Sequence, residues 1–261
     1  MRTRDVRWQG EGREIEAYLA EPEGEGLRPA LIVVHEIWGL DDHIRDVARR
    51  FAAEGFVALA PDLYTGEWRE AMQPDRIMAG MQFLRAAPPE VQRDPKVLGP
   101  LLDARPPAEA AALRTLMRVM NPDQRQAFAR ELRGGVTFLQ GLSGVDGGRV
   151  ACLGFCMGGG ITAQLATLEP SLAKAVIFYG ESPPLERVAA IEARVLGLYG
   201  GEDARITATV PALADAMAAA GKAFTYHVYP EAPHAFFNDT RPTYRPEAAR
   251  DAFARVLDFL A

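Results

Sequence analysis

The chain has 261 residues, 48% of them hydrophobic and 25% charged, with a formal net charge of −6 at pH 7. Such a composition is typical of a globular protein with one large core, and it excludes a disordered or fibrous chain. No block of Lys or Arg stands apart, so we expect no nucleic-acid partner. No segment approaches the roughly 20 apolar residues that span a bilayer, and the first ten residues lack a signal-peptide pattern. We therefore expect a cytoplasmic protein with no membrane partner, as a monomer or homodimer.

The first quarter of the chain predicts a sheet edge followed by buried strands. Residues 6–20 alternate polar and apolar around Gly10-Glu-Gly12, a pattern typical of an antiparallel hairpin. Residues 29–35 form an apolar run, as in a strand buried on both faces. Asp41 or Asp42 can cap the next helix, which Gly55 ends, and residues 56–60 give another strand.

Strands and helices alternate again in the second half of the chain. Strands are expected at 149–153, 174–179, 194–199 and 223–229, and helices at 130–141, 158–168, 210–220 and 246–260. This alternation predicts an α/β fold: a mostly parallel, doubly wound sheet with flanking helices and right-handed crossovers. We expect one domain over residues 1–261.

An insertion interrupts this pattern at about residues 66–121. It is rich in Ala, Arg, Met and Pro, and its proline pairs at 88–89 and 106–107 predict two or three short helices. Two interpretations are open: a cap over an active site, or a surface excursion that only adds bulk. Long insertions gather at the functional edge of such folds, which favours the cap.

The segment Gly154-Phe-Cys-Met-Gly158 has the pattern of a nucleophile elbow with sulfur in place of the serine oxygen. The residue between the glycines lies on a strained strand-to-helix turn, and only small neighbours let the two backbones pass. We therefore expect the Cys156 thiol to project from the carboxyl edge of the sheet. The other cysteine, Cys152, is expected to be buried in the strand, and the two form neither a disulfide framework nor a metal site.

A cysteine attacks a carbonyl as thiolate, so Cys156 needs a base. Of the four histidines, His234 lies in a proline-stiffened loop after the last strand, where an elbow requires its base. The other three, His35 at a strand end, His43 at the start of a surface helix and His227 inside a strand, are interpreted as structural.

The histidine in turn needs a carboxylate that fixes its tautomer. Glu202 and Asp203 both follow the strand at 194–199, and we choose Asp203, with Glu202 as the substitute. The chain order nucleophile, acid, base is that of α/β hydrolases. An oxyanion hole is expected from the N–H of Met157 and from that of Ile37, in the loop after the strand at 29–35.

Taken together, these segments resemble the dienelactone hydrolase family of α/β hydrolases. The matching pieces are His35-Glu-Ile-Trp-Gly, Ala60-Pro-Asp-Leu-Tyr, Gly154-Phe-Cys-Met-Gly-Gly, Gly201-Glu-Asp and His234-Ala-Phe-Phe-Asn. The resemblance implies that Cys156, Asp203 and His234 are the triad and that Glu36 helps to switch the thiol to thiolate. From the residues alone, Glu36 could equally be a carboxylate that pairs with an arginine.

The resemblance leaves the substrate open. The family holds a substrate carboxylate with arginines, one of them four residues after the catalytic histidine, and this sequence has Asn238 there. Arg69, Arg76 or Arg85 could replace the family's second arginine and Arg241 could reach inward, although an exposed arginine is the default expectation. The candidate substrate contacts are Tyr64, Trp38, Arg69, Arg85 and Phe236.

The leading hypothesis is a hydrolase of small esters or lactones that acylates Cys156 and needs neither metal nor organic cofactor. A broad carboxylesterase or thioesterase is a close alternative. A different class would be a thiol redox or binding protein in which Cys156 and Cys152 cycle between thiol and disulfide.

Overall fold

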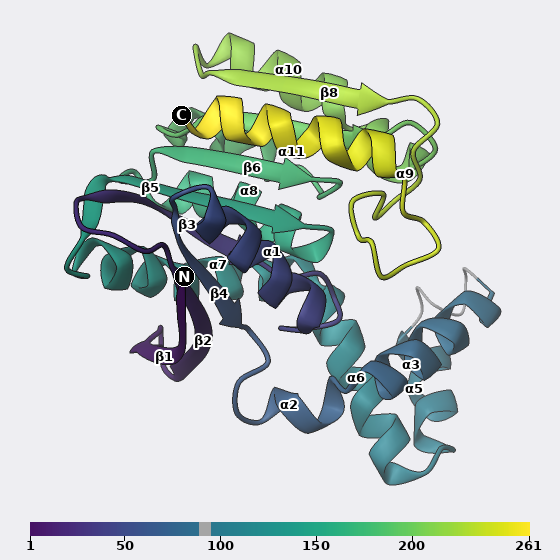
Figure 1. Cartoon of the computed structure of the whole chain (residues 1–261). Helices are drawn as coiled ribbons and strands as arrows, with labels where there is room; N and C mark the ends of the chain where they lie inside the picture. The colour runs from purple at the N-terminus through teal and green to yellow at the C-terminus, as the bar shows by residue number, and fades with distance from the viewer. Residues whose placement is uncertain (89–94) are drawn as a thin grey trace.

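The computed structural model describes residues 1–88 and 95–261, and its centre is a single eight-stranded sheet (Figure 1). The strands are β1 (Arg2–Gln9), β2 (Glu14–Glu21), β3 (Arg28–Val34), β4 (Val57–Asp62), β5 (Val145–Phe155), β6 (Lys174–Phe178), β7 (Arg194–Gly200) and β8 (Phe224–Tyr229). Their order is β1-β2-β4-β3-β5-β6-β7-β8, in which the pairs β1–β2 and β2–β4 are antiparallel and the other five pairs are parallel. The predicted edge hairpin and parallel α/β sheet are therefore confirmed.

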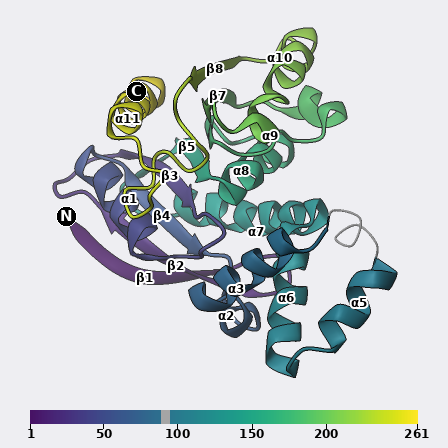
Figure 2. The ribbon, with the colours of Figure 1, turned by 90° about the vertical axis from the view of Figure 1, so that its right-hand side faces the viewer.

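Helices cover both faces of this sheet. On one face lie α1 (Asp42–Ala53) and α11 (Pro246–Leu260), and on the other α7 (Pro122–Gln140), α8 (Met157–Leu168) and α10 (Val210–Ala219), as Figure 2 shows. The shorter α9 (Ala204–Thr207) and the 3-10 helix η1 (Leu185–Ala190) lie in the connections. Among the described residues, no helix has both the length and the apolar character needed to cross a membrane.

The central strands send alternate side chains into two separate cores. In β3, Ile32 and Val34 join the cluster under α7 and α8, whereas Leu31 and Val33 join the cluster under α1 and α11. Successive side chains of a strand point to opposite faces, so a strand covered on both sides must be apolar throughout. This explains the uninterrupted apolar run at 29–35.

The insertion contains more helix than the sequence predicts. Its described part holds four helices, α2 (Trp68–Ala71), α3 (Pro74–Ala86), α5 (Pro95–Asp103) and α6 (Pro107–Met120), instead of two or three. Leu98, Leu102 and Leu113 form a small core of their own, while the Trp68 end joins the main core. In Figure 1 these helices project from the side of the molecule on which the parallel strands end.

The helix expected from Arg130 begins earlier, at Pro122. The side chain of Asn121 accepts a hydrogen bond from the N–H of Asp123, and proline occupies the first turn, where its missing N–H costs nothing. In α1 the cap is Asp41, whose carboxylate accepts from the N–H of Ile44 at 3.0 Å. Both helix starts follow from short polar caps.

Candidate active site

Cys156 stands alone on a sharp turn between β5 and α8. Its φ is 53° and its ψ is −114°, outside the regions that L-residues favour. A Cβ atom at Gly154 would overlap the carbonyl of Gly158, and one at Gly158 would overlap the carbonyls of Val34 and His35. Only glycine fits at either position, so the sequence pattern arises from the close passage of β5, α8 and β3.

Residues with a strained backbone conformation lie on and near this turn. Among the described residues, three other than glycine have a positive φ: Cys156 at 53°, Tyr179 at 39° and Ala235 at 62°. Tyr179 directly follows β6, and Ala235 directly follows His234. Strained residues cluster at functional sites because the surrounding structure must hold them in place. Their positions mark the carboxyl edge around Cys156 as the candidate site.

Asp203 and His234 meet at this edge. A carboxylate oxygen of Asp203 lies 2.5 Å from Nδ1 of His234, and the Asp203 side chain is only 9% exposed. Their loops are joined because the N–H of Glu202 donates to the carbonyl of Ala232 at 3.0 Å. Glu202 itself is exposed, so the structure places Asp203, and not its neighbour, against the imidazole.

The other side of His234 faces the thiol. Burial lowers the pKa of His234, but hydrogen bonds to Asp203 and Cys156 and their negative charges outweigh it and raise the pKa to about 10. The imidazole thus lies between a carboxylate and a sulfur that both favour its charged form. The three predicted residues are brought together in the order acid, histidine, thiol.

Two backbone N–H groups, on the elbow and on the loop after β3, have no backbone acceptor among the described residues. Met157 is the first residue of α8, so its N–H has no partner within the helix. Among the described residues, no backbone acceptor takes the N–H of Ile37. The hydroxyl of Tyr64 donates to the carbonyl of Ile37 at 2.9 Å and touches the sulfur of Met157 at 3.7 Å. Tyr64 therefore supports both donor residues from a buried position.

His35 fixes the start of the same loop. Its Nε2 accepts from the N–H of Leu63 at 3.2 Å, so its proton lies on Nδ1, which donates to the carbonyl of Glu36 at 2.5 Å. Burial lowers the pKa of His35, which keeps the ring neutral. The structural interpretation of this histidine fits its contacts.

Glu36 is buried at 3% exposure and has two uncharged partners. Asn238 Nδ2 donates to Oε2 at 2.7 Å, and the hydroxyl of Tyr179 donates to Oε1 at 3.3 Å. Burial raises the pKa of Glu36, and the Asn238 hydrogen bond opposes that rise only in part. The arginine pairing left open by the sequence is not the arrangement that the structure shows.

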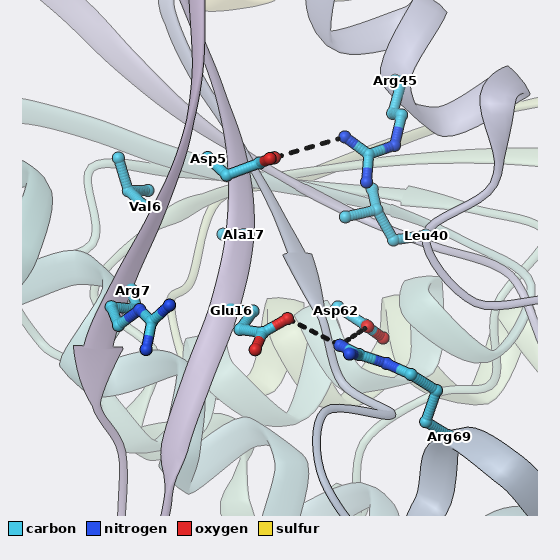
Figure 3. Close-up of a pocket in the computed structure, with 9 residues that line it drawn as sticks. All are labelled: Asp5, Val6, Arg7, Glu16, Ala17, Leu40, Arg45, Asp62 and Arg69. Atoms are coloured by element: carbon cyan, nitrogen blue, oxygen red, sulfur yellow. Dashed lines mark hydrogen bonds and ion pairs between the residues drawn. The ribbon is translucent and has the colours of Figure 1, made fainter.

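The remaining predicted contacts fall in different places. Arg69 points into a surface pocket of about 390 Å³ beside β1 and β2, where it pairs with Glu16 at 2.6 Å and Asp62 at 2.9 Å (Figure 3). Arg85 is exposed in the last turn of α3. Phe236 is fully buried and packs 5.4 Å from the ring of Tyr179. Of these three residues, only Phe236 lies against the site.

Trp38 is half-buried, and the guanidinium of Arg241 lies 4.1 Å from its ring centre. Arg241 is therefore not fully exposed, as the default expectation had it. The negative face of the Trp38 ring attracts the guanidinium and holds the side chain against the protein.

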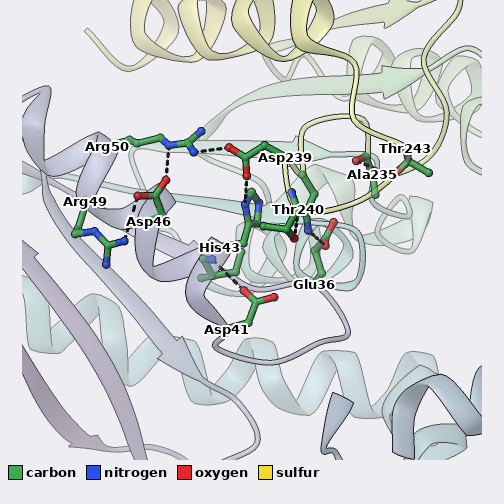
Figure 4. A network of polar contacts seen from close by, with 12 residues as sticks. Glu36, Asp41, His43, Asp46, Arg49, Arg50, Ala235, Asp239, Thr240 and Thr243 are labelled. Atoms are coloured by element: carbon green, nitrogen blue, oxygen red, sulfur yellow. Dashed lines mark hydrogen bonds and ion pairs between the residues drawn. The ribbon is translucent and has the colours of Figure 1, made fainter. Parts of the chain in front are cut away.

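His43 does not lie on the surface as its helix suggested. Its side chain is 1% exposed, and Nδ1 lies 3.1 Å from Asp239, which also pairs with Arg50 (Figure 4). The amphipathic α1 turns its first residues toward the loop after His234. His43 thereby ties that loop to α1. His227, in contrast, is half-buried in the edge strand β8.

Cys152 is buried, and its thiol is protonated at neutral pH. Its sulfur lies 3.3 Å from the Thr162 hydroxyl, and burial raises the pKa of its thiol to about 12. Both cysteines are free thiols. Across the described stretches, no group of three or more His, Cys, Asp or Glu side chains is arranged to hold a metal ion.

Tyr179 and the role of Asn238 escaped the sequence reasoning. One signal was available for Tyr179, since it follows a strand that neighbours the elbow strand, at the level of Cys156. The part played by Asn238 depends on a contact between residues 202 positions apart, for which the sequence gives no spacing rule.

The mainly parallel sheet, the elbow and the histidine loop define an α/β hydrolase. The family model described as "Dienelactone hydrolase family" matches residues 15–261. A protein of Saccharolobus solfataricus named "Putative carboxymethylenebutenolidase" is 38% identical, covering 98% of this chain and 97% of the relative. A protein of the same name from Methylorubrum extorquens is 35% identical, covering 94% of this chain and 76% of the relative.

Solved structures agree with this family assignment. The crystal structure titled "Putative Dienelactone Hydrolase from Klebsiella pneumoniae" superposes with a TM-score of 0.71 at 31% identity, covering 100% of this chain and 99% of the other. The chain belongs to the dienelactone hydrolase family and is a hydrolase of carboxylic esters or lactones.

Proposed function

We propose that the protein hydrolyses small esters or lactones through a thioester on Cys156, with His234 as the base and Asp203 as its orienting acid. The observation that carries this proposal is the continuous chain of contacts from Asp203 through His234 to the Cys156 sulfur. An imidazole held between a carboxylate and a thiol favours the thiolate–imidazolium pair.

In the acylation step, the Cys156 thiolate adds to the substrate carbonyl and the ester C–O bond breaks. The imidazolium of His234 gives its proton to the leaving alkoxide. Neutral His234 then takes a proton from water, the resulting hydroxide equivalent attacks the thioester, and the C–S bond breaks. The acid product leaves, and His234 again shares its proton with the thiolate, so the cycle consumes only ester and water.

The tetrahedral intermediates of both steps carry a negative oxygen, for which we assign the N–H groups of Ile37 and Met157. Loss of one such donor typically costs about 10² to 10³ in rate. We assign Glu36 as the residue that modulates the thiol, since it follows the strand beside the elbow and is buried there.

The surroundings of Asn238 favour a broad carboxylesterase or thioesterase within this proposal. Its amide nitrogen is taken by Glu36, and its oxygen accepts from the N–H and hydroxyl of Thr240. Asn238 is also fully buried, so this position offers a substrate no positive charge and no exposed side-chain atom. A neutral acyl group fits the site better than one with a carboxylate directed at residue 238.

We assign the insertion as a cap on the strand-end side of a single domain. Two features support this role. Trp68 and Leu116 join the main core, and the helices of the insertion project from the side of the molecule on which the parallel strands end (Figure 1). The cap role makes Arg85 on α3 the candidate contact for the outer part of a substrate.

The redox alternative has less support. Cys152 lies three residues before the end of β5, a span of about 10 Å along the strand, and Cys156 follows that end, so the two are beyond the reach of a disulfide. The Cys152 thiol, with its pKa of about 12, is also a poor partner for exchange at neutral pH.

Alkylation of the thiol tests the proposed function. One equivalent of iodoacetamide is expected to label Cys156 and abolish hydrolysis of p-nitrophenyl acetate. His234→Ala should lower turnover by orders of magnitude while the protein stays folded by circular dichroism, and Cys152→Ala serves as the matched thiol control with full activity. Undiminished hydrolysis by protein labelled at Cys156 would contradict the thioester mechanism.

A further inference from the structure

Glu36 and Tyr179 occupy matching positions on either side of the nucleophile. In the sheet register Val34 pairs with Gly154, and Phe155 pairs with Phe178. Continuing the first pairing by two residues brings Glu36 level with Cys156. Continuing the second by one residue brings Tyr179 level with Cys156. The 3.3 Å hydrogen bond from Tyr179 to Glu36 therefore joins the two strand ends that flank the elbow strand.

The orientation of the Asn238 amide is fixed independently of Glu36. The backbone N–H of Thr240 can only donate, and it lies 3.0 Å from Oδ1 of Asn238. The NH₂ group must then face Glu36 Oε2, at 2.7 Å. Oε2 is thereby an acceptor in either charge state of Glu36, and Oε1 is left as the oxygen that can gain or lose a proton.

Each neighbouring element presents a group that affects the charge of Glu36. His43 faces it from α1 and His234 from the loop after β8, and both favour the carboxylate, while Asp41 in its own loop opposes it. The hydroxyl of Tyr179, after β6, interacts electrostatically with both Glu36 and Cys156, so it lies within reach of the carboxyl and of the thiol. Figure 4 shows Glu36 beside Thr240, with the His43–Asp239 pair next to them.

We infer that Tyr179 is a positioning residue that, together with Asn238, holds Glu36 at the strand end next to that of Cys156 and controls the ionisation of Glu36. This inference rests on the proposed function and deepens it. A Glu36 carboxylate repels the Cys156 thiolate, whereas a protonated Glu36 does not. The hydroxyl of Tyr179 donates to Oε1 and favours the carboxylate, so it determines the pH at which this repulsion begins. Tyr179 has a φ of 39°, and its hydroxyl reaches Glu36 from this strained backbone conformation.

The test follows the rate of Cys156 alkylation by iodoacetamide between pH 4 and 10, with the label located by mass spectrometry. Glu36→Gln identifies the step in the profile that belongs to Glu36, because that step disappears. Tyr179→Phe removes only the hydroxyl and is expected to move the same step about one pH unit higher, as loss of a hydrogen bond to the charged form requires. Tyr199→Phe is the matched control, since no described residue bonds the buried Tyr199 hydroxyl, and its profile should superpose on the wild type.

A Tyr179→Phe profile identical to that of the wild type would overturn the inference, as would an equal shift in Tyr199→Phe. Asn238→Leu, which also removes a donor to Glu36, should shift the step in the same direction. Melting temperatures of the wild type and the four variants show whether each protein is folded. Alkylation is measured without substrate. Failure of ester hydrolysis would therefore contradict the proposed function, while the pH profile would still decide the role of Tyr179.

Discussion

The carboxyl edge of the sheet and the helical insertion hold their side chains in different ways. At the edge, Glu36 is held by two hydrogen bonds and His234 by contacts on both sides of its ring. In the insertion, a core of three leucines supports α5 and α6, and large apolar side chains such as Met78 and Leu101 are more than 40% exposed. The reacting groups thus sit in a tightly connected region, and the adjoining helices in a loosely connected one.

This difference separates chemistry from substrate recognition. Acyl transfer needs reacting atoms placed to within a fraction of an ångström, and several strand ends that converge on one point provide that placement. A helical insertion with a small core can rearrange at little cost in free energy, because few buried contacts must break. We therefore expect changes at the edge to affect turnover and changes in the insertion to affect substrate affinity.

The largest effect is expected from Asp203→Asn. The amide cannot hold the His234 proton on Nδ1 as a carboxylate does, and a wrong tautomer in a triad costs about 10³ to 10⁴ in turnover. Glu202→Gln is the matched control, since the adjacent carboxylate is exposed and should be dispensable. Steady-state hydrolysis of p-nitrophenyl acetate measures both variants. Equal losses would show that the acid loop, and not one carboxylate, matters.

A second prediction concerns stability and pH. The pKa of His234 is raised to about 10 in the folded protein, above the 6.5 of an unperturbed histidine. A raised folded-state pKa contributes stability that is fully present below pH 6.5 and is lost as the pH rises through 10. The wild type should therefore exceed His234→Gln in unfolding free energy most clearly at pH 6, and the difference should shrink by pH 10. Urea unfolding at pH 6 and pH 10 measures this difference in unfolding free energy. A difference that does not change with pH would show that the protonated histidine does not stabilise the fold.

The sequence predicted the fold and the elbow well because both depend on local rules. The apolar run at 29–35, the glycines around Cys156 and the strand–helix alternation each report a requirement of nearby backbone. A carboxylate after the strand at 194–199 also followed from the strand pattern, and Asp203, which we chose over Glu202, is the one that contacts His234 in the structure. These features need no knowledge of distant contacts.

What the sequence did not reveal depends on side chains that meet from remote elements. Arg69 was proposed as a substrate contact, yet β2 and β4 place Glu16 and Asp62 within 3 Å of it. His43 was assigned to a surface helix, but the loop after His234 covers it with Asp239. Glu16 lies 53 positions from Arg69 and Asp239 lies 196 from His43, and periodicity cannot predict contacts between such distant residues.

The smallest effect is expected within the insertion and tests the comparison most directly. Leu113 is 4% exposed in the small core, and Leu113→Ala should loosen α5 and α6 and increase their cleavage by protease. Because the strand ends hold Cys156 and His234, kcat should stay within about twofold of the wild type, while KM for a bulky ester should rise about threefold if the insertion caps the site. Leu101→Ala, at a position 45% exposed in the same helical unit, is the matched control and should change neither constant. A fall in kcat for Leu113→Ala without a change in KM would show that the insertion supports the reacting groups themselves, and the two regions would then act as one.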